Sequence, residues 1–198
     1  MKSNVCKIEK GNKDLDAILK ESDRVASYNA FTHKQSLQLR LLCEEIDGML
    51  PNIIDEFDGD FWIEYEDGVC KVNLTVEFAE FTASKKKELI KIAKNKKNAA
   101  ATGIVGKIRS AIEDFFLDEE GKNCGMSSCF YNMATEYNVG LDHSYFWSLG
   151  EYKTTVKQEK HQAAWDELEK SIIASIADDV IVGVKGRQAS IVIIKKFA

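Results

Sequence analysis

The sequence predicts an α+β protein: a two-layer α/β sandwich in which helices cover one face of a mixed, mostly antiparallel sheet. Three observations lead to this fold class. Residues 61–78 alternate apolar and polar side chains as a hairpin does, helical spacing precedes and follows this hairpin, and two apolar strands close the chain. The strands come as two hairpins with helices between them. Packing these helices on one sheet buries the apolar face of the sheet together with the apolar faces of the helices.

The first half of the chain reads as one strand, two helices and a hairpin. Residues 3–9 are expected to form a short strand, and residues 13–30 a helix whose apolar side chains fall on one face. A second helix is expected over residues 34–50, and Pro51 marks its end or a kink. In the hairpin, Glu66-Asp67-Gly68 supplies the turn.

The second half is less regular. We expect a lysine-rich helix that starts at Ser84, a loop over residues 95–102, a helix over 104–117, and an irregular insertion over about 119–152 that ends in an aromatic edge strand, Tyr145 to Tyr152. A helix over 157–177 then leads into strands Val180–Val184 and Ser190–Phe197. This helix is expected to turn four side chains inward, which are Trp165, Leu168, Ile172 and Ile176.

Length and composition limit the function. The 198 residues predict one domain over residues 1–198. A net charge of −5 argues against a general nucleic-acid binder, which usually carries a basic surplus. No signal peptide and no apolar stretch of membrane-spanning length is visible, so we expect a cytoplasmic protein without a membrane partner.

Cysteine and histidine spacing does not predict a metal site. The five cysteines are odd in number and irregularly spaced, which favours reduced thiols over a disulfide framework. Cys124, Cys129 and His143 are the nearest approach to a zinc site, but a zinc site would have a closer first pair and a second pair of ligands.

An acidic turn in the second helix is the first candidate for chemistry. Glu44, Glu45 and Asp47 place three carboxylates within four residues, beside the apolar stripe. Such a carboxylate could act as a general base or hold a water on a metal. The alternative, which the spacing alone favours, is a solvated acidic edge of a core helix.

Two basic segments are further candidates. Residues 85–97 carry seven lysines, a patch that could attract phosphates or an acidic partner, although lysine runs are also ordinary solvated surface. Residues 102–109 place Gly103 and Gly106 at the start of a helix with Lys107 beside them. Glycines at a helix N-terminus let backbone N–H groups approach a phosphate, but they also serve close helix packing. The spacing is neither that of a Walker A loop nor that of a Rossmann fingerprint.

The order of these segments, from about residue 13 to 197, resembles the GHKL ATPase superfamily, which includes gyrase and histidine kinases. The likeness is nearest to bacterial anti-sigma-factor kinases and related histidine-kinase-like ATP-binding proteins. In that family a helix carries a Glu that activates the attacking group and, four residues later, an Asn that binds magnesium. Leu41-Leu42-Cys43-Glu44-Glu45-Ile46-Asp47-Gly48 is the similar stretch: Glu44 matches the Glu, and Gly48 stands in the place of the Asn.

The resemblance implies ATP and Mg²⁺ as ligands. It implies Glu44 as the catalytic residue and six nucleotide-binding residues, which are Glu45, Gly48, Thr102, Gly103, Gly106 and Lys107. The family's Asp-x-Gly-x-Gly motif, whose Asp binds adenine, has no counterpart in residues 79–83. We therefore expect a non-catalytic or weakly active regulatory protein that resembles anti-sigma factors and binds a protein partner such as a transcription regulator.

Two other functions stay open. One is a functional ATP-binding protein or serine kinase of the GHKL class with an altered pocket. The other is an unrelated α/β sandwich with a scaffolding role. Both family-based hypotheses require the acidic turn at Glu44 and the glycines at 103 and 106 to face each other across a cavity floored by the sheet.

Overall fold

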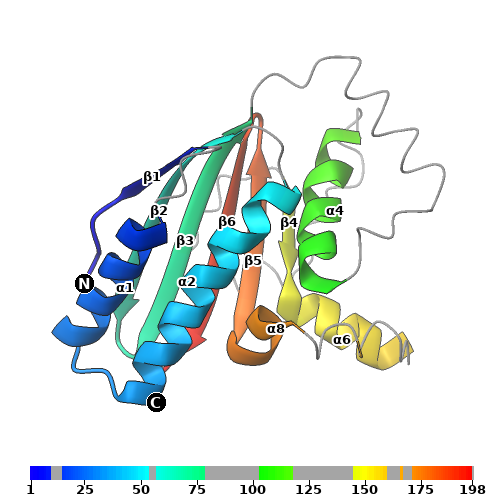
Figure 1. The fold of residues 1–198 in the computed structure, drawn as a ribbon. Helices are drawn as coiled ribbons and strands as arrows, with labels where there is room; N and C mark the ends of the chain where they lie inside the picture. The colour runs from blue at the N-terminus through cyan, green and yellow to red at the C-terminus, as the bar shows by residue number, and fades with distance from the viewer. Residues whose placement is uncertain are drawn as a thin grey trace.

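A single sheet of antiparallel strands runs through the part of the chain that the structure describes (Figure 1). This computed structural model describes residues 1–9, 15–53, 57–78, 103–117, 145–159, 166 and 171–197. The strand order is β1-β2-β3-β6-β5-β4, with the bounds β1 (Cys6–Glu9), β2 (Phe57–Glu66), β3 (Val69–Phe78), β4 (Tyr145–Ser148), β5 (Asp179–Lys185) and β6 (Gln188–Lys196). Each neighbouring pair is antiparallel. The α+β class is confirmed, and these strands form an antiparallel sheet where a mixed one was expected.

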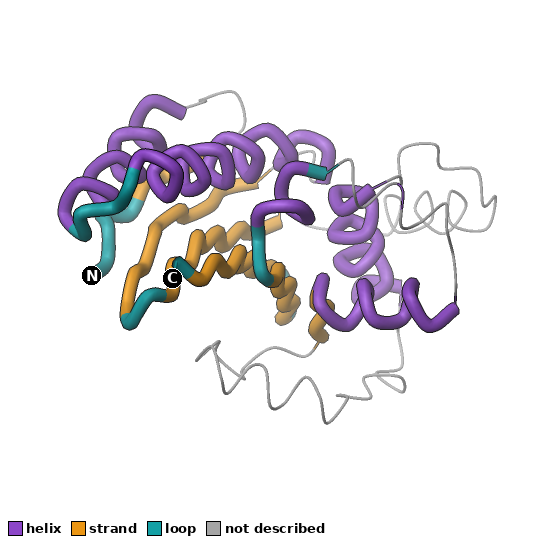
Figure 2. The backbone as a smooth tube through the Cα atoms, turned by 90° about the horizontal axis from the view of Figure 1, so that it is seen from below, coloured by secondary structure: helices purple, strands orange, loops and turns teal. Residues whose placement is uncertain are grey.

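The helices gather on one side of this sheet. They are α1 (Leu15–Tyr28), α2 (His33–Ile53), α4 (Gly103–Leu117), α6 (Leu149–Glu159) and α8 (Ile172–Ile176). Figure 2 shows α1 and α2 side by side over the sheet, with α4 and α6 at its β4–β5 end. Buried side chains from all five helices join the strands in one apolar core.

The central hairpin follows directly from the alternation in the sequence. Phe61 and Ile63 of β2 are fully buried in the core, while the intervening Trp62 lies on the opposite face. Both turn residues have positive φ, 49° at Asp67 and 80° at Gly68, as a two-residue turn between twisted strands requires. The predicted hairpin and its turn are confirmed.

The predicted helix over residues 157–177 is wrong in its last part. Ser171 is extended (φ −83°, ψ 126°), and its hydroxyl accepts a hydrogen bond from the backbone N–H of Ala174, so it caps a separate helix, α8. This new start changes which side chains face inward: Ile173 is buried, whereas Ile172, predicted inward, is 38% exposed. Trp165 and Leu168 lie outside the described residues.

Two further boundaries differ from the predictions. The aromatic edge strand stops at Ser148, because its hydroxyl accepts from the N–H of Glu151 and starts α6. Regular structure therefore occupies the end of the predicted insertion. The second helix, α2, continues two residues past Pro51. The predictions for residues 84–89, 95–102 and 119–144 fall outside the described residues.

Candidate functional site

The two helices that carry the candidate residues pack together on the same side of the sheet. Leu42 and Ile46 of α2 are fully buried in the core that also contains Ile104 and Ile108 of α4. Helices α2 and α4 are therefore neighbours in the fold, although about 50 residues separate them in the sequence. Whether they form a site depends on where their side chains point.

Glu44 lies on the flank of α2 that faces α1. Its Oε1 is 3.2 Å from Nε of Arg40, one turn earlier, and the same guanidinium reaches Oδ2 of Asp23 on α1 at 3.2 Å. Both Arg40 and Glu44 are half-exposed. Because α2 runs between α1 and α4 (Figure 1), these ion pairs place the Glu44 carboxylate on the α1 side of α2.

The other members of the acidic turn point in different directions, because successive helix residues are rotated by about 100°. Glu45 is half-buried, while Asp47 is buried. Gly48 is exposed, and a Cβ built on it would meet no atom within 4 Å. The position where the family has an Asn is thus on the outer surface of α2.

The glycine-containing segment opens α4 as predicted. Gly103 is the first residue of α4, Gly106 is buried, and Thr102 lies outside the described residues. The ammonium of Lys107 lies 5.0 Å from the ring centroid of Tyr152 on α6, a cation–π contact. Burial of Gly106 agrees with the packing alternative, and Lys107 already has an aromatic partner.

Mg²⁺ does not fit the residues that the resemblance assigns to it. Magnesium requires several oxygen ligands in octahedral geometry. Gly48 has no side-chain oxygen, and the Glu44 carboxylate is engaged by Arg40. Within the described ranges, no group of three or more His, Cys, Asp or Glu side chains is placed to hold a metal ion.

A buried polar cluster at the start of β5 was not anticipated from the sequence. Oδ1 of Asp179 accepts hydrogen bonds from the backbone N–H of Gly150 at 2.9 Å and of Val180 at 2.7 Å. Nearby, the ammonium of Lys153 donates to the carbonyl of Ala174 at 2.8 Å. Burial raises the pKa of Asp179 and lowers the pKa of Lys153. The only sequence signal was an acidic residue at the head of an apolar strand.

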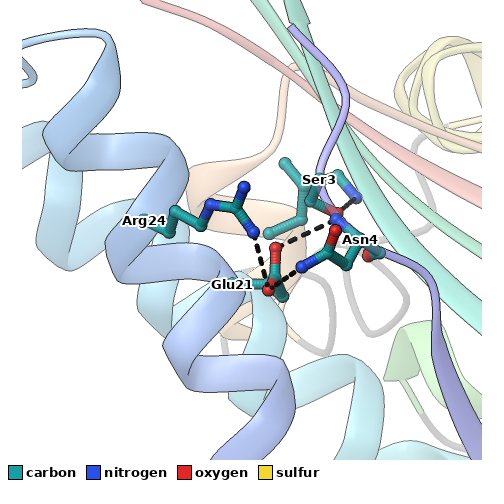
Figure 3. A network of polar contacts seen from close by, with 5 residues as sticks. Ser3, Asn4, Glu21 and Arg24 are labelled. Carbon is teal, nitrogen blue, oxygen red and sulfur yellow. Dashed lines mark hydrogen bonds and ion pairs between the residues drawn. The ribbon is translucent and has the colours of Figure 1, made fainter.

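A second carboxylate network joins the N-terminal segment to α1 (Figure 3). The carboxylate of Glu21 accepts from the backbone N–H of Asn4 at 3.0 Å and from its side-chain amide at 2.9 Å, and Arg24 lies 3.5 Å away. The Ser3 hydroxyl donates to the Asn4 carbonyl and accepts from the N–H of Ile63. These contacts fasten α1 to the edge of the sheet, a structural role.

Two of the three described cysteines lie in surroundings that make them unreactive. Cys43 on α2 and Cys70 on β3 are fully buried free thiols. Burial raises the pKa of Cys70 to about 12 and that of Cys43 well above its usual value, so neither forms a thiolate at neutral pH. Cys124, Cys129 and His143 are outside the described residues.

Comparisons with known proteins found no matching family model, no similar curated protein and no similar solved structure. None of the helices in the described part of the chain is both long and apolar enough to cross a membrane.

Proposed function

We propose that this chain is a non-catalytic regulatory protein of GHKL type that acts by binding a protein partner, in the manner of anti-sigma factors. The segment order of the sequence and the packing of α2 beside α4 support the kinship. The expected facing of Glu44 and the two glycines across a cavity is not found among the described residues, which is why the proposal is a protein without catalysis. The contacts of Glu44 support the loss of catalysis, and they are the observation that carries the proposal.

A general base must reach the proton that it removes. The Glu44 carboxylate instead belongs to a chain of charges, Asp23–Arg40–Glu44, that connects α1 to α2. Position 48 also has no side chain to bind Mg²⁺. In this proposal, α2 corresponds to the family's catalytic helix but lacks its magnesium ligand.

The partner-binding part is tested by co-purification from the source cell. The lysine segment is the proposed contact, because seven lysines on a chain of net charge −5 give a local positive field for an acidic surface. Tagged wild-type protein is compared with a Lys85→Ala/Lys86→Ala/Lys87→Ala variant, and Lys20→Ala on α1 serves as the matched control. We expect one specific protein to be recovered with the wild type and the control and lost with the triple variant. Recovery of no specific protein would contradict the proposal.

A functional ATP-binding protein is the second candidate, and one observation favours it. Glu45 is half-buried on α2, and α2 packs against α4, whose first residue is Gly103. In this alternative, the N–H groups at the start of α4 and the Lys107 ammonium would hold phosphates. Calorimetry with ATP at millimolar concentration tests it: heat that is lost in Lys107→Ala and kept in Lys20→Ala supports nucleotide binding, and absence of heat removes it.

A further inference from the structure

Helix α6 is attached to the rest of the protein by few apolar contacts. Of its side chains described, Leu149 and Val156 are buried, while the others are half-buried or exposed. Elements with little buried apolar surface open at a small fraction of the global unfolding free energy. Polar contacts must therefore contribute much of the free energy that keeps α6 packed against the rest of the protein.

One oxygen atom makes the central polar contact. Oδ1 of Asp179, a residue only 4% exposed, accepts from both Gly150 N in the first turn of α6 and Val180 N in β5. A Cβ built on Gly150 would lie 3.4 Å from Oδ2, so the helix start approaches this carboxylate closely. Asp179 thereby joins α6 directly to the sheet.

A second contact joins α6 to α8. The Lys153 ammonium donates to the carbonyl of Ala174, and it is also attracted by the charges of Asp179, the first residue of β5, and of Asp178 just before it. On the neighbouring strand, Lys195 pairs with Asp178 at 3.2 Å. These are the described charged groups around the cluster.

On its other side, α6 covers part of α4. Tyr152 of α6 lies against the Lys107 ammonium and, with ring centroids 6.0 Å apart, against Trp147 of β4. Figures 1 and 2 both place α6 beside the lower end of α4. Lys107 and Trp147 are half-buried, and movement of α6 away from the sheet would expose both of them further.

We propose that α6 is a detachable cover over Lys107 and that Oδ1 of Asp179 is the latch that holds it against the sheet. Ser148 is the pivot, because α6 follows β4 without a connecting loop. The inference concerns the state of α6 and does not depend on the proposed function: the latch can operate whether the uncovered surface meets a protein or a nucleotide.

The test measures α6 and Lys107 separately. Hydrogen exchange reports opening of α6 through the amides of residues 152–156, and amine labelling followed by peptide mapping reports access to Lys107. Asp179→Ala leaves two N–H groups without their acceptor, so we expect α6 amides to exchange about tenfold faster or more. Labelling of Lys107 rises in parallel, while labelling of Lys20 on α1 and exchange in α2 stay at wild-type levels.

Two matched variants make the result specific. Asp179→Asn keeps an acceptor oxygen and removes the buried charge, so α6 stays closed as in the wild type. Asp16→Ala removes an exposed carboxylate on α1, far along the fold from the cluster, and leaves Lys107 labelled as in the wild type. If Asp179→Ala does not fold, Lys153→Met, which frees the Ala174 carbonyl, is expected to accelerate α6 exchange instead. Unchanged exchange and labelling in a folded Asp179→Ala or Lys153→Met protein would overturn the proposal.

Discussion

Replacing Gly48 with alanine should raise the free energy of unfolding, by an amount that follows from the surroundings of this residue. Gly48 lies inside α2, on its exposed side, and a Cβ there meets no atom within 4 Å. Alanine therefore gains the full difference in helix propensity, about 0.5–1 kcal/mol, with no steric penalty to offset it. For a chain of this length that corresponds to a rise in Tm of about 1–4 °C.

Urea unfolding and a thermal scan of both proteins measure the difference. The change is expected in the midpoint and not in the m-value, because the buried surface is the same in both proteins. Gly48→Asn is the informative companion, since it restores the family's Glu-x-x-x-Asn spacing and should be close to neutral or slightly stabilising. A lower free energy of unfolding in Gly48→Ala would contradict this prediction, because it would mean that no side chain is tolerated at position 48.

Three further predictions concern ion pairing, packing and pH. A double-mutant cycle between Arg40→Ala and Glu44→Gln should give a coupling of about 0.3–0.5 kcal/mol in urea unfolding, since both side chains are half-exposed; a coupling several times larger would contradict that exposure. Gly59→Ala should destabilise by about 1–3 kcal/mol, because the new Cβ would lie 2.9 Å from a backbone oxygen and from Cγ1 of Val76; an unchanged unfolding midpoint would contradict it. Burial raises the pKa of Asp179 above its unfolded value of about 3.9, so the folded state binds this proton more tightly. The free energy of unfolding of the wild type, relative to Asp179→Asn, should accordingly fall as pH rises from about 4 through the raised pKa; a relative value that rises with pH would contradict the sign.

The strands and most helices could be predicted because local patterns determine them. Alternation with an Asp-Gly turn specified the β2–β3 hairpin, and the apolar stripe of α1, which includes Ile18 and Val25, is buried as its spacing predicted. The prediction of one continuous helix through residue 177 was wrong because Ser171 caps a new helix, and apolar periodicity carries no information about caps. Because a new helix begins after Ser171, a different set of apolar side chains faces the core, although apolar residues still recur along the sequence.

The direction of the candidate side chains could not be predicted from the sequence. Neighbouring carboxylates such as Glu44 and Glu45 look equivalent in the sequence, and only the placement of α1 against α2 distinguishes them. The same limit applies to Asp179, whose partners, Gly150 and Lys153, come from another part of the chain. Long-range polar contacts of this kind depend on tertiary packing, which short-range spacing does not encode.

The most direct test of the central claim is the rate of phosphate release from ATP in the presence of Mg²⁺, measured for wild-type protein and Glu44→Gln side by side. We expect no release above the buffer blank for either protein, because Gly48 has no side chain to bind Mg²⁺ and the Glu44 carboxylate is paired with Arg40. Turnover by the wild type that disappears in a folded Glu44→Gln variant would contradict it.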